Sequence, residues 1–436
     1  MKRSPNSFPM EYGNFVQLKS KRIFLSFCAL IVACLFYSTG NFGFLNIFGV
    51  RRLFQFVFLT IFSFSLITIS PKKILNSIKE PVALLSVFTL LVSVVRFSKF
   101  IDVIDKAVAV FLICMIFSVG KSQYNRILMF IIYLSAIFAS AALIQGILIW
   151  FRPEFIYHLG RPYLAESGAE KVTINHPIQY LGFADISSGY KILGHDLVRL
   201  CSFASEPAHL VYSFLIPALL GLTYSGKIRI ASLIVMLFLL IFSGSGSVLL
   251  SLALGIVSLG FFYLLKSRPR FVGLLPFILA LILFVNAVTM DIPYFATKVT
   301  QPFVGYQNVF SSLASKYHSL SCRLSTIADN VKLFIRFPLG VPFERPGGIG
   351  GGLLNVYIWK AGIFGLVFGI FPFYQIFKYC ATIVNTNRKY LLPIALLYGS
   401  LIQVIAFNGV GWYSTPGFMI VALVIRRLRT LLELTI

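Results

Sequence analysis

Long apolar stretches recur through the whole chain and constrain its fold more than any other feature. Twelve of them approach the roughly 20 residues that a membrane-spanning helix needs. Only 12% of the residues are charged, about half the share of an average soluble domain, so a polar surface cannot cover the protein. We therefore predict an all-α polytopic membrane protein, and we exclude soluble enzymes, nucleic-acid binders, and fibrous or disordered proteins. The stretches are Ile23–Thr39, Leu53–Ser70, Pro81–Val95, Val103–Val119, Ile127–Trp150, Ala208–Tyr224, Ile228–Phe242, Val248–Leu265, Phe271–Met290, Leu353–Phe377, Leu391–Phe407 and Trp412–Ile425.

The distribution of cations predicts the orientation. The net charge is +24, and cytoplasmic loops of membrane proteins collect Lys and Arg. With both termini in the cytoplasm, the inner loops and tails hold most of the cations. The short outer loops then hold only Arg51, Arg52, Arg96 and Lys99. This arrangement favours twelve spans, although eleven remain possible.

The predicted spans divide the chain into five parts. Residues 1–150 form five spans, 151–207 a first long outer connection, and 208–290 four spans. Residues 291–352 form a second long outer connection, and 353–436 the last three spans. Connections of this length are usually functional when they are not disordered. The second contains a helical alternation of apolar residues over 307–338, which predicts short amphipathic helices on the membrane surface. Any chemistry is therefore expected at the outer face.

The end of the first connection carries the densest group of reactive side chains. Arg199 precedes Ser205, Glu206, Pro207 and His209 at the mouth of the sixth span. Glu206 and His209 are three residues apart and would share one face of a helix, where a carboxylate could deprotonate a sugar hydroxyl. A well-capped helix start explains the same residues about equally well.

The second connection supplies arginines and glycines. Arg323 and Arg336 could hold phosphate oxygens through their forked guanidinium groups, or they could be solvated near anionic headgroups. Gly340 and Gly347 mark tight turns before the tenth span, and the glycine run 347–352 could form an anion-binding nest or simply a loose loop. There is no metal-binding motif and no nucleotide-binding spacing, so we expect neither metal nor cofactor. Cys201 and Cys322 could pair across the two connections, and the sequence leaves this open.

Together these pieces resemble the O-antigen polymerase (Wzy) family, within the superfamily that also contains O-antigen ligases. The resemblance rests on the number of spans, the two long connections, and the Arg199-to-Pro207 segment. It also rests on Arg336 with a glycine eleven positions later, the Pro338-Leu-Gly340 turn, and Asn355 and Tyr357 entering the tenth span. The first connection lacks an arginine with this glycine spacing. Ligases usually carry a histidine where this chain has Leu354.

The resemblance implies a glycosyltransferase of the bacterial inner membrane with a periplasmic active face. It would move a growing glycan from undecaprenyl diphosphate to a new lipid-linked repeat unit in lipopolysaccharide or related polysaccharide biosynthesis. Arg199, Arg323 and Arg336 would bind the diphosphate, and Glu206 would be the base, with His209 and His318 as substitutes. Partners would be the bilayer and the lipid-linked oligosaccharide, with a chain-length regulator and a flippase of the same pathway as further candidates, but no nucleic acid.

Two other functions fit the sequence less well. An O-antigen ligase would use the same type of donor, and a lipid-linked oligosaccharide flippase or other transporter would place its ionisable residues at mid-membrane depth. The sugars, the linkage, the stereochemical outcome and the oligomeric state cannot be read from this chain.

Overall fold

The computed structural model describes residues 23–34, 36–37, 71–95, 100–151, 178–179, 182–192, 195–202, 210–264, 271–278, 334–340, 353–407 and 415–434. Helix occurs in every predicted apolar stretch that these ranges reach, and Leu53–Ser70 lies outside them. The bounds are Ile23–Cys34, α4 Pro71–Ser77, α5 Pro81–Val95, α6 Phe100–Ser118, α7 Lys121–Phe151, η3 Val211–Leu215, α8 Ile216–Gly221, α9 Lys227–Ile241, α10 Gly246–Leu264, 271–278, α14 Leu353–Thr386, η5 Arg388–Tyr390, α15 Leu391–Phe407 and α16 Thr415–Glu433.

The predicted membrane character is supported by helix length and composition. Three helical segments in the described ranges are long and apolar enough to cross a bilayer: Lys121–Phe151, Gly246–Leu264 and Ala361–Thr386. Large apolar side chains also face outward. On α7, for example, Ile137 is 60% exposed and Ile144 is 54% exposed, which suits a lipid-facing surface. The count of twelve spans and the orientation remain predictions.

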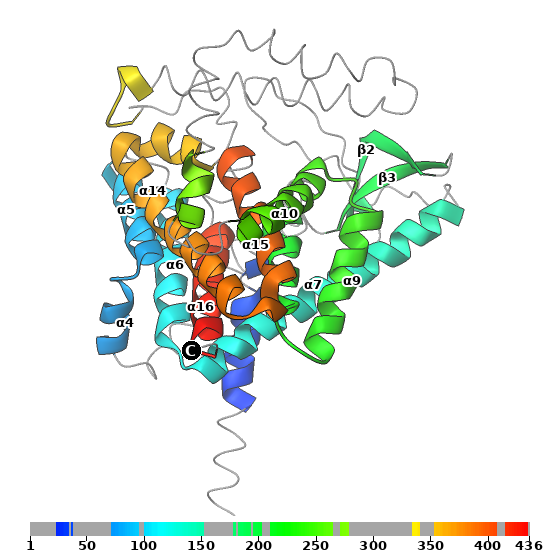
Figure 1. Cartoon of the computed structure of the whole chain (residues 1–436), viewed down its shortest axis with the longest axis horizontal. Helices are drawn as coiled ribbons and strands as arrows, with labels where there is room; N and C mark the ends of the chain where they lie inside the picture. Colours follow the sequence, from blue (N-terminus) through cyan, green and yellow to red (C-terminus); the bar gives the residue numbers. More distant parts are fainter. Residues whose placement is uncertain are drawn as a thin grey trace, which may run out of the picture.

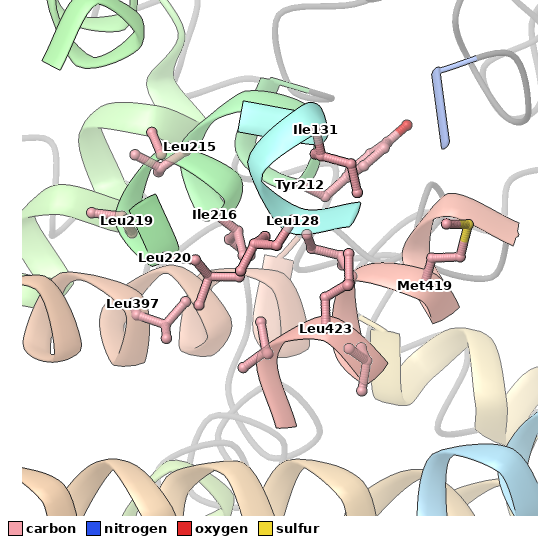
Figure 2. Close-up of a cluster of buried hydrophobic side chains, with 14 of the residues drawn as sticks. Leu128, Ile131, Tyr212, Leu215, Ile216, Leu219, Leu220, Leu397, Met419 and Leu423 are labelled. Carbon is pink, nitrogen blue, oxygen red and sulfur yellow. The ribbon is translucent and has the colours of Figure 1, made fainter. Parts of the chain in front are cut away.

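The helices pack around an apolar core. Side chains from α7, the η3–α8 segment, α15 and α16 meet there, and Figure 2 shows ten of them labelled, including Leu128, Leu220, Leu397 and Leu423. Helices α10 and α15 cross closely beside this core, because Gly255 faces the backbone of Leu396 and a Cβ at Gly255 would lie 2.7 Å from its Cα atom. Small residues allow such close approaches between membrane helices.

The first long connection differs from the prediction, because it contains strands. Strands β1 Ile178–Gln179, β2 Gly182–Ile192 and β3 His195–Ser202 form an antiparallel sheet in the order β1-β2-β3. Ile192 pairs with His195, so two residues, Leu193 and Gly194, join β2 to β3. A two-residue connection containing glycine is a recognised hairpin signal, and the all-α prediction did not use it.

Helix α16 also differs from its predicted stretch. The prediction ended the last span at Ile425 and placed Arg426, Arg427 and Arg429 in a cytoplasmic tail. In the structure α16 continues to Glu433, so these arginines lie on the helix, and only 4% of Arg427 is exposed. The helix continues because Leu428 and Leu431 keep an apolar face buried against the bundle beyond the arginines.

Candidate functional site

The predicted site residues fall into two groups. Glu206, His209, His318, Arg323 and Gly347 lie outside the described residues. The described group has backbone positions on three elements: Arg199 on β3, Asn355 and Tyr357 in the first two turns of α14, and Arg336 and Gly340 in the segment 334–340.

The segment 334–340 is a turn that docks onto α14. The Gly340 N–H donates to the carbonyl of Phe337 (2.9 Å), and the Ile363 N–H donates to the carbonyl of Pro338 (2.8 Å). Gly340 has φ 98°, a left-handed value that favours glycine. The turn is therefore fixed to the helix through its own backbone, which holds the neighbouring Arg336 near this part of α14.

Gly362 makes this docking possible. Its φ of 58° and ψ of −137° interrupt the helical geometry of α14, and this leaves the Ile363 N–H available to the turn. A Cβ at this position would clash with the carbonyl oxygen of Pro338 and would lie 2.6 Å from the carbonyl carbon of Leu339. The turn can approach so closely only because residue 362 has no side chain.

The docked turn exposes an arginine together with two apolar side chains. Arg336 is exposed, and so are Ile335 (72%) and Leu339 (67%). Asn355 and Tyr357 precede Gly362 on the same helix by seven and five residues, which is about one to two helical turns. The structure thus docks Arg336 and Gly340 at the kink of α14, and Asn355 and Tyr357 lie on the segment of the helix that precedes this kink.

The strand that carries Arg199 is anchored separately. Arg199 is paired in register with Asp185 of β2. On either side of it, the Leu200 N–H donates to the carbonyl of Phe242 (2.9 Å) and the Ser202 hydroxyl donates to the carbonyl of Phe138 (3.1 Å). The end of β3 is therefore held against α7 and the C-terminal end of α9.

The chain re-enters the bundle after His209 through an unusual helix. Residues Val211–Leu215 form a π-helix, a rare conformation that often occurs at functional sites. The buried Tyr37 hydroxyl donates to the carbonyls of Ile131 (3.2 Å) and Ser213 (3.3 Å) and also contacts the Ser135 hydroxyl. These bonds tie the π-helix to α7 through Tyr37.

The two anchored segments lie along the same edge of the molecule but are not close together. In Figure 1, strands β2 and β3 are at the right of the upper edge, the yellow turn that begins the 334–340 segment is at its left, and the C-terminus lies toward the opposite side. The described parts of the two connections, the sheet and the 334–340 segment, therefore lie on one edge but at separate places along it, and the orientation of that edge in the membrane stays a prediction.

Sequence reasoning missed a second polar cluster, at the other end of the bundle. Arg429 of α16 donates to both carboxylate oxygens of Glu80 (2.7 and 2.6 Å) and to the Tyr379 hydroxyl (3.3 Å). Arg427 donates through Nε to the Thr223 hydroxyl (2.9 Å) and through Nη2 to the Thr223 carbonyl (3.1 Å). In the sequence, Leu428 and Leu431 continue the apolar periodicity past Ile425, and this pattern could have predicted that the arginines lie on a packed helix.

Contacts and burial within this cluster shift the pKa values of two of its arginines. The hydrogen bonds that Arg429 donates to the Glu80 carboxylate raise the pKa of Arg429, and its bond to the Tyr379 hydroxyl adds to this. Burial lowers the pKa of Arg426, but an arginine pKa is so high that the side chain stays charged. The described residues contain no group of three or more His, Cys, Asp or Glu side chains that could hold a metal ion.

No protein-family model, no curated protein and no solved structure matches this chain.

Proposed function

We propose that this protein is a membrane glycosyltransferase that polymerises lipid-linked oligosaccharide repeat units at the outer face of the bacterial inner membrane. The donor is a glycan on undecaprenyl diphosphate, and the acceptor is one lipid-linked repeat unit. The proposal rests on the motif resemblance of the sequence and on one structural observation, the docked turn that carries Arg336.

The docked turn supports the proposal through its chemistry. A lipid diphosphate has an anionic head and an apolar tail, so its site needs a cation beside apolar surface at the membrane interface. Arg336 is exposed, and so are Ile335 and Leu339 of the same turn, while other helices carry outward-facing apolar residues that suit a lipid-facing surface. A guanidinium suits this role because it can bind phosphate oxygens in a bidentate way.

The reaction that we propose breaks one bond and forms one bond. A terminal sugar hydroxyl of the acceptor attacks the anomeric carbon of the donor glycan, and the bond from that carbon to the diphosphate oxygen breaks. Glu206 takes the hydroxyl proton as general base, with His209 or His318 as the substitute. Arg323 and Arg336 stabilise the negative charge that develops on the departing undecaprenyl diphosphate. Because β3 lies at the other end of the same edge (Figure 1), Arg199 would bind the diphosphate of the acceptor lipid instead.

A deletion strain tests this function against its main alternative. Loss of a polymerase should leave lipopolysaccharide cores capped with a single repeat unit, and expression of the full chain should restore the ladder of longer glycans. Loss of a ligase should instead leave bare cores while polymer accumulates on the lipid carrier. Bare cores, or an unchanged ladder in the deletion strain, would rule out the polymerase proposal.

A further inference from the structure

The outer face of helix α4 carries positive charge together with one large apolar side chain. Lys72, Lys73 and Lys79 are exposed, the first two on the helix and the third in the turn that follows it. Leu75 is 64% exposed. Among the residues that the structure describes, none forms an ion pair with these lysines. We name the four residues Lys72, Lys73, Leu75 and Lys79 the α4 lysine surface.

The winding of the chain gathers these side chains on one side. The N–H groups of Ile78 and Lys79 donate to the carbonyls three residues earlier (both 3.3 Å), so a tight helical turn continues past the end of α4. Lys72 lies three residues before Leu75, and Lys79 lies four residues after it. This spacing puts side chains on the same side of a helix. The cations and the leucine therefore form one continuous surface.

The opposite face of α4 is fixed to the bundle at the level where an apolar helix ends. Ile74 and Ile78 pack against the core. The Ser77 hydroxyl shares a hydrogen bond (2.8 Å) with the hydroxyl of Ser118, the last residue of α6. In Figure 1, α4 lies at the lower left margin of the bundle. An amphipathic helix in this position is suited to the boundary between acyl chains and headgroups.

The acidic residue next to this surface in the sequence does not neutralise it. Glu80 is the only Asp or Glu between residues 12 and 101. Both of its carboxylate oxygens accept hydrogen bonds from Arg429 of α16 (2.7 and 2.6 Å). Because the charge of Glu80 is already paired with that arginine, the three lysines of the α4 lysine surface keep a local excess of positive charge.

We propose that the α4 lysine surface binds the anionic headgroups of phospholipids, with Leu75 inserted among the acyl chains. Lysine stems can lie along apolar surface while their ammonium groups reach lipid phosphates. A stable protein partner would need roughly 800 Å² on each side with an apolar centre, whereas this surface has one apolar side chain and three cations. In the predicted orientation the lipids belong to the cytoplasmic leaflet. The proposal does not depend on the glycosyltransferase function.

Site-specific photo-crosslinking tests the proposal in the full-length protein. The crosslinking residue p-benzoylphenylalanine replaces Leu75, and the protein is placed in vesicles of equal parts phosphatidylglycerol and phosphatidylcholine. Light attaches this residue to the molecule that it contacts, and mass spectrometry identifies the product. One lysine near a membrane surface favours anionic lipid by about fivefold. We therefore expect phosphatidylglycerol products to exceed phosphatidylcholine products by at least about fivefold.

A second crosslinking position separates this surface from lipid contact in general. Ile137 is 60% exposed in the middle of α7, and the same crosslinking residue there should label the two lipids about equally. Equal labelling at position 75, the same preference at both positions, or no lipid product at position 75 would overturn the proposal. In native membranes, a product with a protein in place of lipid at position 75 would also overturn it.

Charge variants then identify the cause of the preference. Lys72→Gln, Lys73→Gln and Lys79→Gln together should make the labelling at position 75 equal for the two lipids, whereas arginine at the same three positions should keep the preference. High salt should weaken the preference, because it screens exposed charges. Lys378→Gln removes an exposed lysine of α14 outside this surface and should change nothing. A preference that survives the three glutamine substitutions would refute the α4 lysine surface.

Discussion

Replacement of Gly362 by alanine should undock the turn that carries Arg336. The backbone at residue 362 has φ 58° and ψ −137°, a conformation that costs a residue with a side chain on the order of 1–3 kcal/mol. The new Cβ would also clash with the Pro338 carbonyl and break its hydrogen bond from Ile363, which contributes about 1 kcal/mol. The docked state therefore loses roughly 2–4 kcal/mol.

Limited trypsin digestion measures the undocking of the turn directly, because Arg336 is an exposed trypsin site inside it. A loss of roughly 2–4 kcal/mol raises the population of the undocked turn by about 30- to 700-fold. Cleavage after Arg336, identified by mass spectrometry, should accelerate by up to this factor. The acceleration stops when the turn is fully undocked.

Gly260→Ala is the matched control. Gly260 lies within α10, and a Cβ there would meet no atom within 4 Å. Alanine should be neutral or should stabilise the helix by about 0.5–1 kcal/mol, with no change in cleavage after Arg336. If Gly362→Ala is cleaved at the wild-type rate and unfolds at the wild-type temperature, the docking argument is wrong.

The remaining predictions concern charged residues. Arg323→Ala and Arg336→Ala should each shorten or abolish the polymer at normal protein levels, and Lys should not fully restore it, because a point charge cannot reproduce bidentate contacts; wild-type ladders would contradict this. Glu206→Gln should leave membrane abundance normal but reduce the polymer to single repeats, since a base contributes roughly 10²–10⁴ in rate; near-normal polymer would leave only a helix-capping role. Glu80→Gln should lower the unfolding temperature through loss of about 1.5–3 kcal/mol from its paired charged hydrogen bonds, whereas Glu433→Gln should change it little because its pair with Lys121 is exposed; equal effects would refute the stabilising role of the Glu80–Arg429 pair.

Hydropathy along the sequence determined where the helices form. Helices α5 and α15 have the predicted bounds, Pro81–Val95 and Leu391–Phe407, because a run of apolar residues must satisfy its backbone internally in a membrane. The sequence also indicated that chemistry would gather in the two long connections. The structure places described parts of both on one edge (Figure 1), while Glu206, His209, His318 and Arg323 stay predictions.

Tertiary structure alone decided the features that depend on distant partners. The strands around Arg199 form through pairing between segments, and the docked turn depends on Gly362, which lies 24 residues beyond Pro338. The arginines of α16 resemble a solvated tail in sequence, and their burial depends on Glu80, 349 residues away from Arg429. Hydropathy reports the local preference of each segment, whereas a buried charge or a close backbone contact is stable only when the fold supplies its partner.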